Sequence, residues 1–182
     1  MESVEGYVAQ ERKTNKIQVV RADISHVEGI AKVCTDGWLA TYDGLHSQEY
    51  IDRVIEEYYN HERIHKEVLT NDEYWYGWFV ALENGQVVGA IGGGTTGEKR
   101  GEIFVLYLDR NRRREGIGTL LIDYFTRIQK EKGIVEQWVS VAKGNEKGIP
   151  FYEAKGFVKQ FERPSQGSTE EETVSYRYCR NI

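Results

Sequence analysis

Four arginines lie within the five residues 110–114, and glycines follow at Gly116 and Gly118. An apolar run precedes this segment, and an amphipathic helical pattern follows it. The first N–H groups of a helix lack partners and carry the positive end of its dipole, so they bind phosphate. Arginine adds charge-assisted hydrogen bonds, and glycine lets a ligand approach the backbone. The pattern favours a pyrophosphate cradle over residues 113–118, although a solvated basic loop closed by flexible glycines fits these residues about equally well.

Two widespread phosphate-binding motifs do not match this segment. A Walker A loop requires G-x-x-x-x-G-K-[ST], and the sequence has no such run. A dinucleotide fingerprint requires a third glycine at the position that Leu121 occupies. The net charge of the chain is -5. An acidic chain with one short cationic patch is expected to bind neither nucleic acid nor a membrane surface.

Hydrophobic periodicity predicts the elements that position the cradle. Alternating or continuous apolar runs predict strands, and apolar residues at i, i+3 and i+4 predict helices. The predicted strands are 16–22, a hairpin over 78–92, 102–108, 135–141, 157–163 and 173–178. A first helix is predicted to start near Ile24, and further helices are predicted over residues 48–59, 117–128 and 149–156. Gly133 is expected to end the helix that starts at residue 117, and Gly156 the last helix. This order of elements predicts a single mixed α/β domain.

Glycines predict the breaks between these elements. Asn84-Gly85 supplies the positive φ angles of a type I′ hairpin turn. Two glycines in residues 36–45 interrupt the helical pattern, so a loop is expected there. The glycines of residues 92–97 are expected to loosen the chain after the hairpin.

The remaining composition predicts a cytoplasmic protein. The 182 residues suit one domain, residues 1–182, in which residues 1–15 form a polar tail without the apolar core of a signal peptide. No apolar run reaches the roughly 20 residues of a membrane span. Cys34 and Cys179 are expected to be free thiols. His61 and His65 lie four apart without further ligands nearby, which favours a surface helix, and no metal site is expected.

Two stretches resemble motifs of a known superfamily. The segment L-Y-L-D-R-N-R-R-R-E-G-I-G-T-L-L resembles motif A of the GNAT superfamily of acetyl-CoA-dependent N-acetyltransferases, whose core [QR]-x-x-G-x-[GA] is matched by Arg113, Gly116 and Gly118. The stretch from Val141 to Phe157 resembles motif B. Together the two motifs lie in the order and at the spacing of that family. The resemblance covers roughly residues 17–178.

The resemblance implies a fold and a cofactor site. The implied fold is a mixed, mostly antiparallel central sheet that is splayed between its fourth and fifth strands and flanked by helices. Acetyl-CoA is the implied acyl donor, with its pantetheine arm in the splay and its pyrophosphate on the helix start. The implied cofactor-binding residues are Leu106, Tyr107, Leu108, Arg113, Arg114, Glu115, Gly116, Ile117, Gly118, Thr119, Asn145 and Tyr152. Glu115 is expected to point away from the pyrophosphate, because a carboxylate there would weaken binding. Gly148 replaces a more usual alanine, which is expected to delay the motif B helix by a residue or two.

The resemblance also implies roles in acetyl transfer. Tyr152 matches the tyrosine that protonates the leaving thiolate, with a core aromatic as the alternative. Glu102 matches a position that serves as general base in several members, whereas other members use ordered water alone. The amide of Leu108 would stabilise the oxyanion. Asn145 would bond pantetheine, or it caps the following helix.

The implied acceptor site lies between the first two helices and a late hairpin loop. The predicted substrate-binding residues are Trp38, Tyr42, Asp43 and Glu102. The first three, with Glu49 as a further candidate, are expected to face residues 166–172. Carboxylates and aromatic faces suit a cationic amine, so a small amine or polyamine is favoured. A protein lysine or N-terminus remains open as acceptor, as does an inactive acyl-CoA-binding sensor as function. The oligomeric state is also open, with a homodimer among the alternatives.

Overall fold

The structure, a computed structural model, describes residues 17–112, 114–165 and 173–182. Its strands form one seven-stranded sheet in the order β1-β2-β3-β4-β5-β7-β6. Neighbouring strands are antiparallel except β4 and β5, which are parallel. The strands are β1 (Ile17–Arg21), β2 (Trp78–Glu83), β3 (Gln86–Gly97), β4 (Arg100–Leu108), β5 (Glu136–Ala142), β6 (Val158–Pro164) and β7 (Val174–Asn181). The mixed, mostly antiparallel sheet predicted from the sequence is confirmed.

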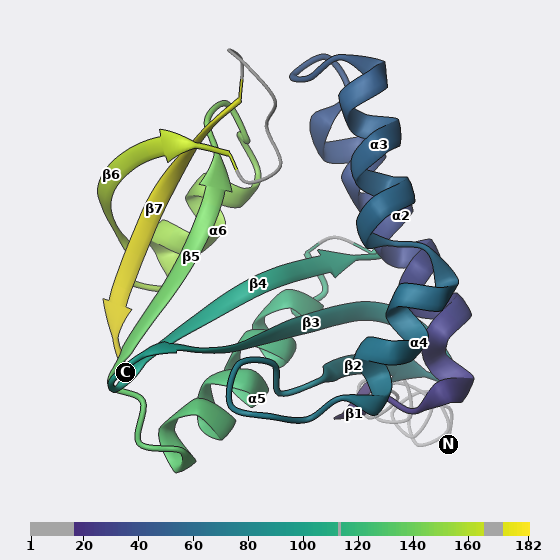
Figure 1. Cartoon of the computed structure of the whole chain (residues 1–182), viewed down its shortest axis with the longest axis horizontal. Helices are drawn as coiled ribbons and strands as arrows, with labels where there is room; N and C mark the ends of the chain where they lie inside the picture. The colour runs from purple at the N-terminus through teal and green to yellow at the C-terminus, as the bar shows by residue number, and fades with distance from the viewer. Residues whose placement is uncertain (1–16, 113, 166–172) are drawn as a thin grey trace, which may run out of the picture.

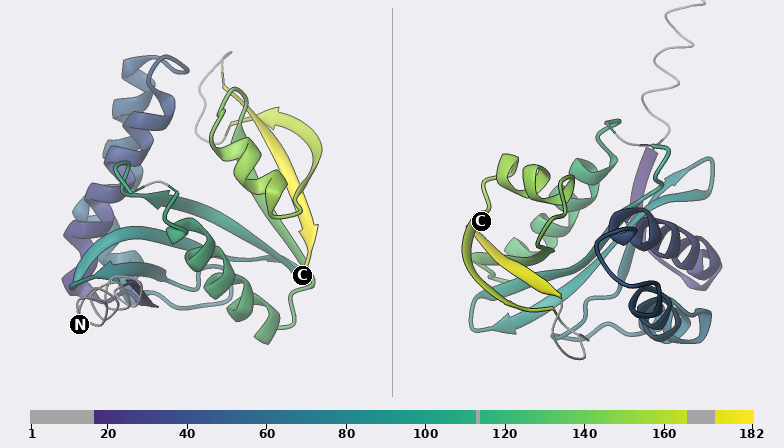
Figure 2. Two further views of the ribbon diagram at one scale, coloured as in Figure 1. Left: turned by 180° about the vertical axis from the view of Figure 1, so that it is seen from behind. Right: turned by 90° about the horizontal axis from the view of Figure 1, so that it is seen from above.

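Helices cover both faces of the sheet (Figures 1 and 2). They are the short 3₁₀ helix η1 (Ile24–His26), α2 (Val27–Tyr42), α3 (Gln48–Tyr58), α4 (His61–Leu69), α5 (Ile117–Glu131) and α6 (Gly148–Ala154). Phe125 of α5 and Tyr152 of α6 share one buried cluster with Ile91 of β3. Ile30 of α2 and Ile64 of α4 form a second cluster on the opposite face. Two apolar cores on opposite faces therefore hold the sheet rigid between them.

The parallel strands β4 and β5 pair over only part of their length. Pairing runs from Arg100↔Glu136 to Ile103↔Val139. Directly after Ile103 the register with β3 skips Phe104, which is the extra residue of a β-bulge. A bulge bends its strand and increases its twist, so β4 leaves β5 at this point. Figure 1 shows the two strands opening into a V, with α2 and α3 beside one arm and β5, β6 and β7 in the other.

Turn and stop signals in the sequence are placed as predicted. Asn84 and Gly85 have φ angles of 50° and 79°, and they join β2 to β3 as the expected hairpin. Helix α5 starts at Ile117, and Gly133, with a φ of 84°, follows its end. His61 and His65 lie on α4, as expected for a helix. Among the described residues no helix is long and apolar enough to cross a membrane.

The loop predicted over residues 36–45 is wrong for most of its length, because α2 continues to Tyr42. Gly37 is a helical residue whose missing side chain leaves space for an aromatic ring. A Cβ at Gly37 would lie 2.6 Å from Cδ1 of Tyr107, on β4. A glycine in a helix costs roughly 1 kcal/mol relative to alanine. Close packing of α2 against β4 outweighs this local cost.

The loosening predicted over residues 92–97 is also wrong, since β3 runs unbroken to Gly97. Here the glycines accommodate residues 73–76, which pack across the strand. The Tyr76 N–H donates to the Gly93 carbonyl, and the Thr95 N–H donates to the Glu73 carbonyl, both at 2.9 Å. A Cβ at Gly94 would collide with the Tyr74 backbone. Close backbone approach, rather than flexibility, is the physical reason for these glycines.

Candidate active site

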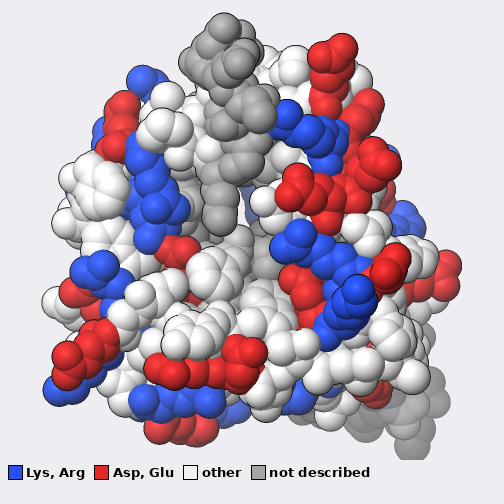
Figure 3. All heavy atoms as spheres, viewed as in Figure 1, with Lys and Arg blue, Asp and Glu red and all other residues white. Residues whose placement is uncertain are grey.

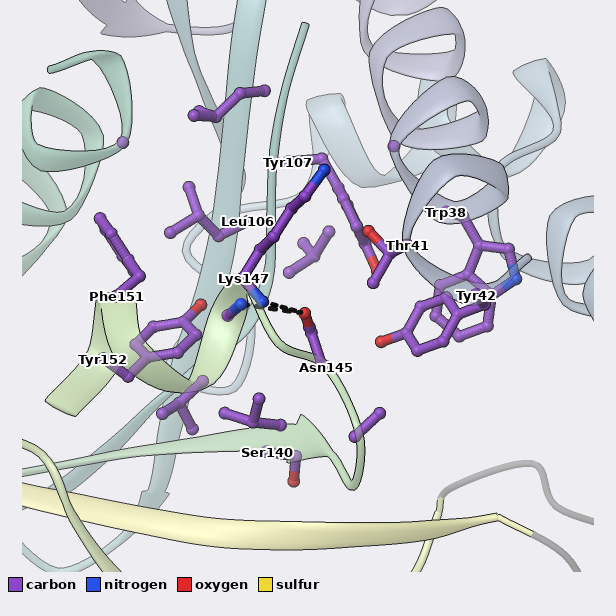
Figure 4. Close-up of a pocket in the computed structure, with 18 of the residues that line it drawn as sticks. Trp38, Thr41, Tyr42, Leu106, Tyr107, Ser140, Asn145, Lys147, Phe151 and Tyr152 are labelled. Atoms are coloured by element: carbon purple, nitrogen blue, oxygen red, sulfur yellow. Dashed lines mark hydrogen bonds between the residues drawn. The ribbon is translucent and has the colours of Figure 1, made fainter. Parts of the chain in front are cut away.

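A cleft of about 790 Å³ fills the V between β4 and β5. One wall is formed by α2 and α3, and the other by the end of β5 and the start of α6 (Figure 4). The N-terminal turn of α5 lies at one end of the cleft. Aromatic rings and backbone edges make up most of its lining. The lining includes Trp38, Tyr42, His46, Tyr50, Tyr58, Tyr59, Leu106, Leu108, Arg114, Gly116, Gly118, Thr119, Asn145, Glu146, Lys147 and Tyr152.

The free edge of β4 presents backbone groups to this cleft. The Asp109 N–H donates to the Val88 carbonyl on the β3 side. Alternate residues of a strand direct their N–H and C=O groups to the same side. Leu106 and Leu108 therefore direct theirs to the opposite side, where β5 has already diverged. This edge can pair with an extended, amide-bearing ligand.

The loop between β4 and α5 brings further amides to the end of the cleft. It starts with a turn in which the Asn111 N–H donates to the Asp109 carboxylate at 3.0 Å. Arg114 and Gly116 then have positive φ angles of 65° and 80°, and Gly116 is the N-cap of α5. Among the cradle residues predicted from the sequence, Arg113 lies outside the described residues. The unpaired amides after Gly116 form an anion-binding helix start.

Close packing at Gly118 holds α6 against this helix start. A Cβ at Gly118 would lie 3.3 Å from the Phe151 ring, so only a residue without a side chain fits without displacement. The Lys155 ammonium at the end of α6 donates to the Thr119 hydroxyl at 2.7 Å. The two helices are therefore fixed relative to each other where the predicted phosphate and thiol sites meet.

Arg112 is held by two carboxylates rather than directed at the cleft. Its guanidinium donates to both Glu83 oxygens, at 3.0 and 2.7 Å. It also donates to both Glu115 oxygens, at 2.6 and 2.9 Å. These bonds hold the pKa of the Glu115 carboxyl below its usual value. Glu115, expected to point away from phosphate, does not line the cleft, and Arg112 neutralises its charge.

Tyr152 of α6 faces the cleft from the motif B side. Its side chain is buried, and burial raises the pKa of its phenol, which therefore stays protonated at neutral pH. The Tyr42 phenol, which adds a smaller effect in the same direction, approaches from the opposite wall (Figure 4). A protonated phenol in a cleft can donate a proton to a group that becomes anionic there.

The N-cap residue of α6 is Lys147, and Asn145 binds the amides at this helix start. Its side-chain oxygen accepts from the Gly148 N–H at 2.9 Å and from the Lys147 N–H at 3.3 Å, as drawn in Figure 4. A Cβ at Gly148 would lie 2.6 Å from the Asn145 amide nitrogen. This contact explains the glycine, and α6 begins at Gly148 itself, so the expected delay of the helix is wrong.

Glu102 lies on β4 before the two strands part. It pairs with Trp138 of β5 in the sheet. Its carboxylate forms a buried ion pair with the Arg177 guanidinium, and the side chain is 11% exposed. Glu102 is not among the residues that line the cleft. The fold thus separates it from Tyr152, Trp38 and Tyr42, which the cleft brings together.

The predicted acceptor side of the cleft is an aromatic wall. Trp38 and Tyr42 line it, with ring centroids 4.0 Å apart, whereas Asp43 is exposed and does not line the cleft. Burial raises the pKa of Tyr42 to about 12.

The sequence prediction did not assign the wall residues His46, Tyr50, Tyr58 and Tyr59 to the site. The sequence signal that could have found them is the spacing of Tyr50, Val54 and Tyr58, which places them on one face of α3. The same spacing fits a helix face that packs on the core equally well. The predicted partner segment, residues 166–172, lies outside the described residues.

Charges are mixed on the face that carries this cleft. Figure 3 shows Lys and Arg interspersed with Asp and Glu, without an extended field of one sign. In the part of the chain that the structure describes, no three metal-ligating side chains gather. The arrangement can hold an anionic, amide-bearing ligand along β4 and α5, and a second molecule against the aromatic wall.

Comparison with known proteins gives a consistent relationship. The sequence model of the Acetyltransferase (GNAT) family matches residues 38–157. The chain is 30% identical over 142 residues to a spermidine N(1)-acetyltransferase of Thermoplasma acidophilum, covering 78% of this chain and 88% of that protein.

Solved structures extend this similarity to the fold. The PaiA N-acetyltransferase of Thermoplasma acidophilum, in complex with coenzyme A, has a TM-score of 0.78 at 25% identity, covering 91% of this chain and 99% of that one. Ard1 of Thermoplasma volcanium has a TM-score of 0.69 at 20% identity, covering 92% and 98%. The latter likeness concerns the fold alone.

Proposed function

This chain belongs to the GNAT family of acetyltransferases, and we propose that it transfers the acetyl group of acetyl-CoA to a primary amine in a ternary complex. The observation that carries this proposal is the junction of three features in one cleft. A free strand edge, a glycine-capped helix start and a buried, protonated tyrosine meet there. These are the groups that a thioester of coenzyme A needs for binding and for departure of its thiol.

Acetyl-CoA is proposed to lie along β4. Its pantetheine amides would pair with Leu106 and Leu108, whose backbone groups face the gap. Its pyrophosphate would accept hydrogen bonds from the amides that follow Gly116, and the Arg114 side chain lines the same end of the cleft. The coenzyme A complex of the PaiA structure supports this donor. The thioester would then lie between Tyr152 and the aromatic wall.

The transfer is proposed to proceed by direct attack. The acceptor nitrogen adds to the thioester carbonyl, and the Leu108 amide is proposed to stabilise the oxyanion. As the carbon–sulfur bond breaks, the Tyr152 phenol gives its proton to the thiolate. Burial keeps that proton on the phenol until the thiolate forms. The predicted general-base role of Glu102 is not part of this proposal, because its carboxylate binds Arg177 away from the cleft lining.

A small amine or polyamine is the proposed acceptor. The aromatic wall of Trp38, Tyr42, Tyr50 and Tyr58 suits a cationic amine, because ring faces attract cations. The spermidine N(1)-acetyltransferase of Thermoplasma acidophilum, 30% identical to this chain, supports a polyamine. A protein lysine or N-terminus is the alternative acceptor.

Thiol release from acetyl-CoA over a panel of amines tests the proposal. The panel contains putrescine, spermidine, spermine, a simple alkylamine and lysine- and N-terminal peptides. Calorimetric titration of the same protein with acetyl-CoA gives the donor affinity independently. Turnover with one amine class, with the acetylated product identified by mass, is the expected result.

Two other outcomes are distinct. Binding of acetyl-CoA without turnover of any amine would replace the enzyme by an acyl-CoA-binding sensor. Absence of acetyl-CoA binding would contradict the placement of the donor.

A further inference from the structure

His46 is a second titratable group that the structure brings to the proposed reaction site. It lies between α2 and α3 and lines the cleft. Its ring stacks on Tyr42, with centroids 4.9 Å apart and planes at 13°. The edge of the Tyr50 ring meets it at the same centroid distance, with planes at 78°. One ring lies nearly parallel to the imidazole and the other nearly perpendicular to it, so the two contacts fix its orientation.

The surroundings of His46 favour the neutral imidazole. Its Nδ1 atom is buried and makes no hydrogen bond within the described residues. A charged imidazolium needs partners for both N–H groups, so burial disfavours it. Burial accordingly lowers the pKa of His46, and the Leu45 backbone offsets part of the effect. A neutral imidazole can accept a proton at neutral pH.

Few other side chains of the cleft could take up a proton. Tyr42 and Tyr50 pack against His46, and Asp43 is its backbone bridge partner. Burial raises the pKa of Tyr42, so its phenol is already protonated at neutral pH. Across the cleft, Glu146 and Lys147 are exposed lining residues, and the Lys147 ammonium cannot accept a proton. Glu102 faces Arg177 instead. His46 is a partly buried proton acceptor with a fixed orientation, on the wall proposed to receive the amine.

We propose that His46 is the general base that takes a proton from the acceptor ammonium, directly or through one water molecule. This inference rests on the proposed acetyl transfer and assigns to it a residue that the motifs do not contain. His46 is stacked on Tyr42, whose phenol faces Tyr152 across the cleft (Figure 4). The base and the acid would therefore lie on opposite sides of the proposed thioester position.

The proton balance of the reaction closes with these two residues. An N–H bond of the ammonium breaks, and its proton moves to the imidazole. The freed lone pair forms the C–N bond, the C–S bond breaks, and Tyr152 protonates the sulfur. The amide nitrogen returns a proton to Tyr152, and the imidazolium releases its proton to solvent. An ammonium and acetyl-CoA thus become an acetamide, free coenzyme A and one proton.

The pH dependence has a definite sign. His46 acts as a base only when it is neutral, so kcat/KM falls as pH decreases through its pKa. Because burial lowers that pKa below its usual value of 6.5, the fall is expected on the acidic side of 6.5. At alkaline pH the free amine becomes abundant in solution and needs no base.

His46→Gln and His46→Phe test this assignment, with spermidine, or whichever panel amine the wild type turns over fastest, as the probe. Phe keeps an aromatic ring between Tyr42 and Tyr50 but cannot accept a proton. Both variants are expected to lose roughly 10–100-fold in kcat near pH 7. The loss should shrink at pH 9–10, and the acidic limb should disappear. His65→Gln, an exposed histidine on α4, is the matched control and should behave as wild type.

The proposal is overturned if His46→Phe retains the wild-type rate and acidic limb. It is also overturned if Glu102→Gln or Glu146→Gln removes that limb while His46→Phe keeps it, since the base would then be that carboxylate. Acetyl-CoA affinity, measured by calorimetry, should stay within about 2-fold of wild type in the His46 variants and shows that they are folded. Failure of the wild type to turn over any amine would instead contradict the proposed function.

Discussion

Two surfaces of the cleft present different kinds of chemical group. The surface proposed to bind acetyl-CoA, here called the donor wall, runs along the free edge of β4 to the first amides of α5 and presents mainly backbone. The acceptor wall, formed by α2, α3 and the residues between them, presents side chains, and Tyr42 is in ring contact with both Trp38 and His46. Backbone amides need particular glycines and a particular chain path, whereas an aromatic wall can be assembled from several helices in many ways. The donor wall therefore leaves a motif in the sequence, and the acceptor wall does not.

Because the two walls differ in this way, mutations in them are expected to change different measured quantities. Changes on the donor wall should alter acetyl-CoA affinity, and changes on the acceptor wall should alter turnover and the choice of amine. Tyr152, proposed to face both ligands, should affect the chemical step alone.

Gly116→Glu should have the largest effect on the donor wall. Gly116 has a φ of 80°, and its glutamate replacement would place a negative charge beside the proposed pyrophosphate. We expect acetyl-CoA affinity, measured by calorimetry, to fall by about 100-fold or more, which corresponds to roughly 2.7 kcal/mol.

Gly133→Glu is the matched control for this change. Gly133 has a φ of 84° at the other end of α5, and a Cβ at either glycine would meet open space. Both variants carry the same backbone strain and the same added charge. An equal loss of affinity in the two would show that strain, not the phosphate site, is responsible.

Tyr152→Phe should lower kcat by about 100-fold, because proton transfer to a leaving group contributes roughly 10²–10⁴-fold. The ring remains packed against Phe151 and Phe157, so acetyl-CoA affinity should change little. Steady-state kinetics with calorimetry checks both quantities. An unchanged kcat would remove Tyr152 as the acid and leave it a core aromatic.

Arg112→Met should weaken acetyl-CoA binding by about 10-fold through an indirect route. Without Arg112, the Glu115 carboxylate loses its partner and lies unneutralised in the proposed phosphate loop. Adding Glu115→Gln to Arg112→Met should restore most of the affinity, because it removes the repelling charge. The effect should also shrink at high salt.

Arg110→Met tests whether this result is specific, since Arg110 is the exposed neighbour in the same basic segment. It should change affinity by less than about 2-fold. If Glu115→Gln fails to restore binding in the Arg112 variant, then the charge of Glu115 is not the cause of the weaker binding.

Gly37→Ala should have the smallest effect, and on stability. The added Cβ would lie 2.6 Å from Cδ1 of Tyr107, an overlap that costs roughly 1–3 kcal/mol. Part of this cost is offset by the better helix propensity of alanine. Urea unfolding should show a net loss of about 1 kcal/mol. In a Tyr107→Leu background the loss should vanish, and a loss of the same size there would contradict the packing explanation of Gly37.

Local signals were sufficient for much of this protein. The Asn84-Gly85 hairpin, the start of α5 at Ile117 and its end before Gly133 follow from turn and cap chemistry, which acts over a few residues. The family and the mixed sheet follow from the two motifs and the order of the elements. The turn and the helix ends depend on neighbours in the chain, and the motifs are read directly from it, so the sequence alone was enough to predict these features.

Tertiary packing decided the features that local signals misjudged. Gly37 lies in a helix and Gly94 in a strand because Tyr107 and Tyr74, distant in the chain, occupy the space of the missing side chains. The fold likewise placed Glu102 with Arg177 and His46 with Tyr42 and Tyr50. The sequence does not show whether a glycine or a titratable side chain is exposed to solvent or contacts a residue of another element. Only the three-dimensional arrangement supplies the partner, and the partner determines what the residue can do.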